Sequence, residues 1–237
     1  RPSADGNWDD EFTHRHKQVK VFARQLLAST HSRDTYNLAY CSKLHPAMTY
    51  PLCISSMSLK QCNKINTVLR AALLPALGYA RNLPLGIVLG PLADGGLAIH
   101  CTHTEQGLRK ISTLTGHLRQ GGRASSLLRI AIDWCQLLAG VGYPILSHPT
   151  GNIPHFEACW VRTLRDSLRT HHLSISLTNA WMEPPQRHGD FHIMDKLGPL
   201  HTPLKAMRIN QCRLWLRVSR LSDITHTNGK SLLSQAL

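Results

Sequence analysis

The stretch WDDEFTHRHKQVKVFARQL, residues 8–26, repeats its apolar side chains at intervals of three, four and seven positions. This spacing places them on one side of an α-helix, which turns once in about 3.6 residues. Asn7 is a suitable N-cap, and the three acids after Trp8 stand where the helix dipole favours negative charge. The apolar side consists of Trp8, Phe12, Val19, Phe22, Ala23 and Leu26.

The opposite side of this predicted helix is basic. Projected at 100° per residue, Lys17, Lys20 and Arg24 fall on one stripe far from the apolar side. The whole chain shares this bias, with 27 Lys and Arg against 14 Asp and Glu and a formal net charge of +13. A chain with this charge is expected to bind a polyanion, and nucleic acid is the partner that we expect.

A second amphipathic helix is predicted from Ser58 onward. Ser58 and Gln61 have the spacing of a capping box, which satisfies backbone N–H groups at a helix start. Lys60 and Lys64 lie on the side opposite the apolar residues. Those apolar residues are Leu59, Cys62, Ile65, Leu69 and Leu73.

The rest of the chain is also predicted to be mostly helical. One helix starts near Ser32 and should end before Pro46, because proline disfavours helix in the residue before it. An irregular region then contains a short apolar strand at 87–89. Gly140 is a suitable C-cap for a helix expected at 125–138. Further helices are expected at 105–118, 125–138, 157–170, 190–197 and from Thr202-Pro203 onward, with a strand at 173–177.

The predicted fold class is therefore mainly α, a helical bundle followed by a second helical region with a few short strands. Three regions are expected, at residues 1–78, 79–143 and 144–237. The segment 144–154 is rich in Pro, Gly, Ser and Thr, which makes it the best candidate for a boundary between subdomains.

Composition limits the location of the protein. The longest apolar runs, such as 68–77, contain Arg70 and Pro75 and are much shorter than the roughly 20 residues that a membrane span needs. Seven cysteines, an odd number in apolar surroundings, are typical of reduced thiols in an intracellular protein. The chain begins with Arg1 and not Met, and we expect it to be a fragment of a longer protein.

The sequence lacks the residue spacings of the common catalytic and metal-binding motifs. His100, Cys101 and His103 are close in sequence but lack the paired spacing of a zinc site. Asp9-Asp10 lies in the first turn of a helix, where the dipole explains it. No nucleophile elbow or phosphate-binding loop occurs. We therefore predict no catalytic residue and no metal or other cofactor site in this chain.

Three features in order resemble the region after the palm in reverse transcriptases of LINE-like, non-LTR retrotransposons. The first is Asp5-Gly6 followed by a long helix, which corresponds to the start of the thumb. The second is a helix with Arg33 that leads to LHPAMTYPL at 44–52. The third is Pro91, three variable residues, then Gly95, Gly96 and Leu97.

The C-terminal part of the chain carries a further likeness to the tail of such elements from microbial eukaryotes. Three strings carry it: Ile193-Met194-Asp195, Asn210-x-Cys-Arg-Leu, and LSDIT at 221–225. The family usually has a tryptophan a few residues before Pro91, where this chain has Leu85.

The resemblance implies a thumb and connection region that grips a primer-template, an RNA–DNA hybrid or the element RNA. The palm, with its Mg²⁺ ions and polymerase activity, would lie in the missing part of the same polypeptide, so this chain alone is predicted to be inactive. The nucleic-acid-binding residues would be Lys17, Lys20, Arg24, Lys60 and Lys64. A turn at Pro91, Gly95 and Gly96 would fix the connection, or would simply join core elements.

Two alternatives stay open from the sequence. The first is a free-standing basic helical protein that binds nucleic acid or acts as a scaffold, without catalysis. The second is a metal-dependent nuclease built on Asp190 and Asp195, although Lys196 follows Asp195 directly and would point elsewhere.

Overall fold

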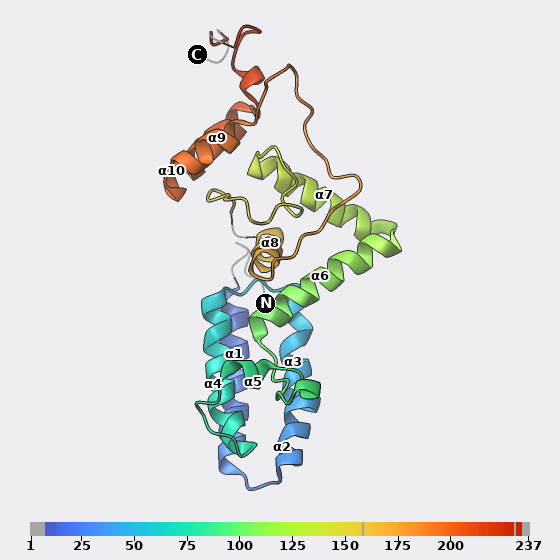
Figure 1. The fold of residues 1–237 in the computed structure, drawn as a ribbon, viewed down its shortest axis with the longest axis vertical. Coiled ribbons are helices and arrows are strands. Elements are labelled where there is room, and N and C mark those ends of the chain that lie inside the picture. Colours follow the sequence, from blue (N-terminus) through green and yellow to red (C-terminus); the bar gives the residue numbers. More distant parts are fainter. Residues whose placement is uncertain (1–7, 158, 230, 234–237) are drawn as a thin grey trace. The chain divides into compact units, whose positions relative to one another are not determined.

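The computed structural model describes residues 8–157, 159–229 and 231–233, which are mainly α-helical (Figure 1). This confirms the predicted fold class. The chain divides into two compact units, Arg1–Thr115 and Gly116–Leu237. The finer division at 78 and 143 stays a prediction. Asn7 and the Asp5-Gly6 pair lie outside the described residues.

In the first unit, α1 (Asp9–Ala28) and α4 (Leu59–Ala76) lie side by side with their N-terminal ends together (Figure 1). At that end the Gln61 amide donates a 2.7 Å hydrogen bond to the Asp9 carboxylate. The predicted capping box is present, since the Gln61 N–H donates to Ser58 Oγ and the Ser58 N–H to Gln61 Oε1. The two helices bury Val19, Phe22, Ala23 and Leu26 from α1 and Cys62, Ile65, Leu69 and Leu73 from α4.

The chain between these helices is helical almost throughout. It forms α2 (Arg33–Ala39), a π-helical turn (Tyr40–Leu44), α3 (His45–Thr49) and a 3-10 turn (Tyr50–Cys53). The prediction that helix ends before Pro46 was wrong. Pro46 lies in the first turn of α3, where a missing N–H leaves no hydrogen bond unmade, and the π turn shifts the hydrogen-bond ladder just before it.

The adjacent glycines at 95 and 96 close a tight turn behind α5 (Leu85–Leu89), a short helix where a strand was predicted. After Pro91 the chain makes one 3-10 turn, and Gly95 then adopts a left-handed φ of 78°. A Cβ atom on Gly96 would lie 2.1 Å from the carbonyl oxygen of Gly90. Glycine is thus needed at 95 for its backbone freedom and at 96 for its missing side chain.

This turn folds the chain back onto α5. The Leu97 N–H donates to the Ile87 carbonyl at 2.9 Å, and the Ile99 N–H to the Val88 carbonyl at 3.0 Å. Val88 and Ile99 are buried in the same core as α1 and α4. The turn therefore joins elements of the core of the first unit.

The second unit contains α7 (Gly122–Ala139), α8 (Trp160–Thr170), α9 (Ile193–Leu200) and α10 (Pro203–Leu216). The connecting helix α6 (Thr102–Gln120) crosses the division between the units. The predicted helix ends are confirmed at two sites. Thr202 caps α10 with proline at its first position, and Gly140 ends α7 in the left-handed conformation.

The segment 144–154 is packed into the second unit around the buried Arg165 of α8. The Arg165 guanidinium donates to the carbonyl oxygens of Ile145 (3.1 Å), His148 (3.3 Å) and Gly151. Ile145 and Leu146 are 1% and 2% exposed. A buried arginine thus gives an irregular loop the hydrogen bonds that regular structure would otherwise supply.

The predicted strand at 173–177 was wrong. Its backbone is irregular, and the Ile175 N–H donates to the Leu146 carbonyl at 3.0 Å. In the described residues β structure is limited to two isolated bridges, His192 with Arg220 and Thr225 with Leu232. An apolar, β-branched segment becomes a strand only where a neighbouring chain offers a ladder of N–H and C=O groups.

No helix in the described part of the chain is long and apolar enough to span a membrane.

We expect Gly96→Ala to destabilise the first unit by about 2 kcal/mol, because the added Cβ would overlap the Gly90 backbone. Gly86→Ala is the matched control, since the Cβ position of Gly86 in α5 meets nothing within 4 Å. Alanine at 86 should stabilise the helix by roughly 0.5–1 kcal/mol. Urea unfolding followed by far-UV circular dichroism measures the free energy of unfolding of both variants. Equal values for Gly96→Ala and Gly86→Ala would contradict the close approach of Gly96 to Gly90.

Candidate nucleic-acid interface

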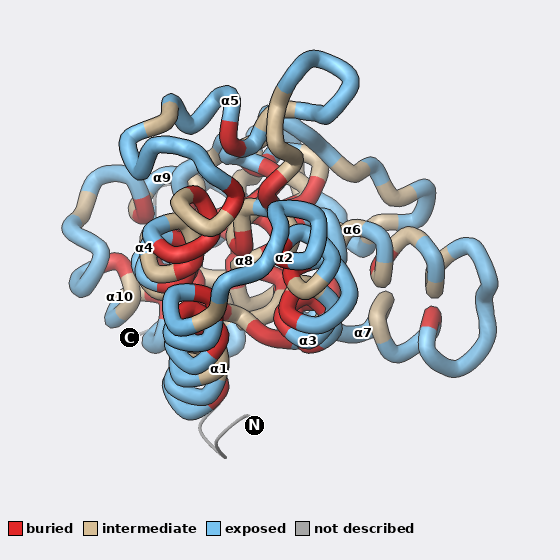
Figure 2. The backbone as a smooth tube through the Cα atoms, turned by 90° about the horizontal axis from the view of Figure 1, so that it is seen from below, coloured by how far each residue is buried: buried red, intermediate tan, exposed pale blue. Residues whose placement is uncertain are grey.

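The five cations predicted to contact nucleic acid are all exposed on the first unit. Lys17, Lys20 and Arg24 lie on α1, and Lys60 and Lys64 lie on α4. Figure 2 shows α1 as exposed along most of its outer side, with buried positions recurring on the side that contacts the core. Because both helices turn their apolar sides inward, their basic sides face solvent.

Lys64 links the basic side of α4 to α1 beside Phe12. The Lys64 ammonium lies 6.0 Å from the centre of the Phe12 ring, so the side chain reaches from α4 across to α1. Burial lowers the pKa of His16, and repulsion from Lys20 and Lys64 lowers it further. Lys20 of α1 and Lys64 of α4 therefore both lie near enough to His16 to disfavour its charged form.

Little negative charge opposes this surface. The acids of α1 occupy its first turn, where Glu11 forms a 2.6 Å ion pair with Arg15 and Asp9 is hydrogen-bonded to Gln61. None of the five cations forms an ion pair with another residue in the described ranges. Exposed cations without a carboxylate partner can contact phosphate groups.

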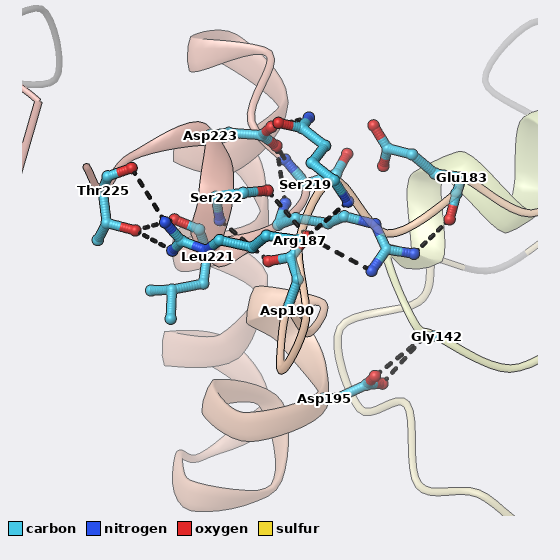
Figure 3. Close-up of polar contacts among 12 residues, drawn as sticks. Gly142, Glu183, Arg187, Asp190, Asp195, Ser219, Leu221, Ser222, Asp223 and Thr225 are labelled. Carbon is cyan, nitrogen blue, oxygen red and sulfur yellow. Dashed lines mark hydrogen bonds and ion pairs between the residues drawn. The ribbon is translucent and has the colours of Figure 1, made fainter. Parts of the chain in front are cut away.

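The two carboxylates of the nuclease alternative have separate structural roles in the second unit (Figure 3). Asp190 accepts hydrogen bonds from the Ser222 N–H (3.1 Å) and Ser222 Oγ (2.8 Å), and Arg220 Nη1 lies 3.8 Å away. Asp195 accepts the Gly142 N–H at 3.0 Å. Each carboxylate points to its own partners, and the two do not form a paired metal site.

Asn210 and Arg213 of α10 bind the C-terminal carbonyl groups of α7. Arg213 Nη2 donates to the carbonyl oxygens of Leu137 (2.7 Å) and Leu138 (3.2 Å), and Asn210 Nδ2 donates to Leu138 (3.0 Å). A Cβ on Gly140 would lie 2.7 Å from the guanidinium carbon. The positive guanidinium thus fills the space beside Gly140 and stabilises the negative end of the α7 dipole.

The three C-terminal strings singled out in the sequence come together in this unit. Backbone hydrogen bonds join the first and third strings, from the Leu221 N–H to the Phe191 carbonyl (3.1 Å) and from the Ile193 N–H to the Ser219 carbonyl (3.0 Å). Arg213 of the second string donates from Nη1 to Ser219 Oγ at 3.3 Å. Arg187 donates to Thr225 Oγ1, which ties the loop before α9 to the last string (Figure 3). It also donates to the carbonyl of His226. The strings therefore hold one structural module together.

Sequence spacing did not reveal one cluster of possible metal ligands in the first unit. It consists of His45, His100 and Glu105, whose ligand atoms all lie within 4.8 Å of one another. His100 had been considered with Cys101 and His103, but the fold groups it with other residues. His45 is far away in the sequence, so no local motif could have predicted the group.

No family model, curated protein or solved structure matches this chain. Fold and surface therefore define only a class: a mainly helical protein of two compact units, with exposed cations on two packed helices.

We expect Arg213→Met to destabilise the second unit by about 3 kcal/mol, because it removes the donor to the partly buried Leu137 carbonyl and leaves the Leu138 carbonyl with Asn210 alone. Arg208→Met is the control, since Arg208 is exposed on the same helix. Tryptophan fluorescence during urea unfolding is the readout, because Trp134, Trp160, Trp181 and Trp215 all lie in this unit. A loss no larger than the control's would count against the capping role.

Acid should destabilise the second unit through His155. This side chain is 3% exposed, its Nε2 lies 2.8 Å from the Ala139 carbonyl, and burial, aided by repulsion from Arg213, lowers its pKa. With a folded pKa below the unfolded value of about 6.5, the unfolded state binds the proton first as pH falls. Stability present at pH near 7.5 is therefore lost progressively as pH drops through about 6.5.

Melting temperatures at several pH values test this expectation. His155→Gln keeps an amide donor for the Ala139 carbonyl and should flatten the acid-side loss. His14→Gln, at an exposed position on α1, should leave the pH profile unchanged. An unaltered profile in His155→Gln would show that other groups cause the acid sensitivity.

Proposed function

We propose that this chain is the thumb and connection part of a retroelement RNA-directed DNA polymerase, which grips the primer-template and lacks the palm. Three sequence features in the order found in LINE-like, non-LTR reverse transcriptases support the proposal. The observation that carries the binding role is the set of exposed cations on α1 and α4, with Lys64 of α4 reaching the Phe12 ring of α1.

The proposed mechanism is electrostatic. Cations at fixed intervals along a helix contact phosphates without reading bases, which suits a duplex whose sequence changes during synthesis. Lys17 and Arg24 are separated by about 10 Å along the axis, at 1.5 Å per residue. Phosphoryl transfer and its Mg²⁺ ions would belong to the palm, so the chain alone would bind without polymerising. Seven cysteines present as free thiols fit an intracellular protein of this kind.

Binding of a labelled RNA–DNA hybrid, followed by fluorescence anisotropy between 50 and 200 mM salt, tests the interface. If roughly six phosphates are contacted, affinity should fall on the order of a thousandfold over this range. Replacing Lys17, Lys20, Arg24, Lys60 and Lys64 with glutamine should weaken binding at least about tenfold at low salt and reduce the salt slope by up to about four.

A control variant with the same change in net charge distinguishes binding at the α1 and α4 cations from non-specific attraction of nucleic acid by the positive charge of the whole chain. It replaces five exposed cations of the second unit, Arg119, Arg123, Lys196, Lys205 and Arg208. The proposal expects a much smaller loss in this variant and tighter binding of the hybrid than of duplex DNA. Equal losses would refute the α1–α4 interface, and equal affinity for both duplexes would favour a free-standing basic nucleic-acid-binding protein.

A further inference from the structure

Three segments of the first unit bring together side chains that commonly bind metals. His45 is the first residue of α3, His100 precedes α6, and Glu105 lies in the first turn of α6. The two imidazole rings stack with their centres 4.0 Å apart. His100 Nδ1 lies 2.9 Å from Glu105 Oε1. Two imidazoles and one carboxylate thus place possible ligand atoms within 4.8 Å of one another.

One nitrogen of this cluster lacks a partner in the described structure. His45 Nε2 is buried and has no hydrogen bond to any described residue. A buried polar atom left unpaired is unfavourable and is rare in native structures. A cation held between His45, His100 and Glu105 would satisfy this nitrogen.

The surroundings fix the backbone of the ligand segments. The His100 N–H donates to the Tyr40 hydroxyl at 3.2 Å, and burial raises the pKa of Tyr40 to about 12, so this hydroxyl stays neutral. The Thr102 N–H and hydroxyl donate to Asn66 Oδ1 at 3.1 and 2.6 Å, which anchors the start of α6 on α4. Supporting hydrogen bonds of this kind preorganise metal ligands.

The cluster is accessible from solvent and has room for an ion. A cavity of about 20 Å³ lies beside His45, His100 and Glu105, which is enough for one water or ion. The His100 side chain is 43% exposed and Glu105 is 14% exposed. Arg109 Nε lies 3.6 Å from Glu105 Oε2 and can hold the carboxylate in place.

We propose that His45, His100 and Glu105 form a binding site for a zinc-type divalent metal, with a fourth coordination position open to solvent. Two imidazoles and one carboxylate suit Zn²⁺, whereas Mg²⁺ and Ca²⁺ prefer oxygen ligands throughout. Bond lengths of about 2.0–2.1 Å place the ligand atoms of one tetrahedral ion about 3.3 Å apart. The present spacing of at most 4.8 Å exceeds this value by up to about 1.5 Å, so metal binding would draw the three side chains together and turn the stacked imidazole rings.

The metal would link α3 to the start of α6. It would thereby close the core of the first unit at the point where the chain leaves the glycine turn. This structural role is independent of the proposed grip on nucleic acid, since none of the three ligands belongs to the cation set on α1 and α4.

Titration of the reduced, metal-free protein with Co²⁺ and Zn²⁺ tests the site. We expect one equivalent of Co²⁺ to give visible d–d bands without a thiolate charge-transfer band, and Zn²⁺ to displace it and raise the melting temperature. His100→Ala, at an exposed position, and Glu105→Gln should each weaken binding at least about tenfold, and His45→Ala should do the same. His103→Ala is the control and should bind normally.

Circular dichroism of each variant shows whether it folds, and the exposed His100 provides a variant that should remain folded even if His45→Ala does not. A dissociation constant weaker than about 100 μM for both ions would overturn the proposal. So would undiminished binding in folded His100→Ala and Glu105→Gln, or a thiolate band that assigns the ion to cysteines.

Discussion

The parallel contact between α1 and α4 is the interaction on which the first unit depends. Val19 and Ile65 are 0% and 1% exposed, and each large apolar side chain buried in this way contributes about 1.5–3 kcal/mol. Repulsion between solvent-exposed cations is on the order of 1 kcal/mol per close pair and is screened by salt. Burial therefore dominates, and the basic sides of both helices remain exposed although their charges repel.

The second unit solves a different problem, because it is rich in irregular chain and the protein is poor in acids. Arg165 and Arg213 are 4% and 3% exposed, and in the described residues both bind backbone carbonyl groups. One organises the loop at 144–154, and the other caps α7. Since these guanidinium groups bind carbonyl groups and not carboxylates, they order the chain without reducing its positive charge.

Sequence alone predicted the features that depend on local spacing. The apolar side of α1, the capping box at Ser58 and the Thr202-Pro203 start of α10 each follow from residues within a few positions of one another. The errors arose where distant contacts decide. Helix continues past the start of α3 because a π turn repositions Pro46, and 173–177 lacks a partner strand.

The same distinction holds for the candidate sites. The exposure of Lys17, Lys20 and Arg24 follows from the helical projection of α1 alone, but the reach of Lys64 from α4 to Phe12 of α1 needed the packing of two helices. The His45, His100 and Glu105 cluster joins segments separated by the whole of α4, so only the fold could reveal it. For Asp190 and Asp195 the fold argues against a site that the sequence allowed. Both carboxylates could be metal ligands by sequence, but in the fold they accept hydrogen bonds from Ser222 and Gly142.

A grip on nucleic acid needs cations at fixed positions more than it needs many cations. One helix offers a single row, whereas two parallel helices offer two rows whose separation is set by the apolar contact between them. The capping box and the bond from Gln61 to Asp9 fix the ends of these rows, and Phe12 holds the Lys64 side chain near the contact. The side chains that position the cations therefore lie mostly beneath the proposed binding surface, where a change would alter the spacing of charge and leave the net charge unchanged.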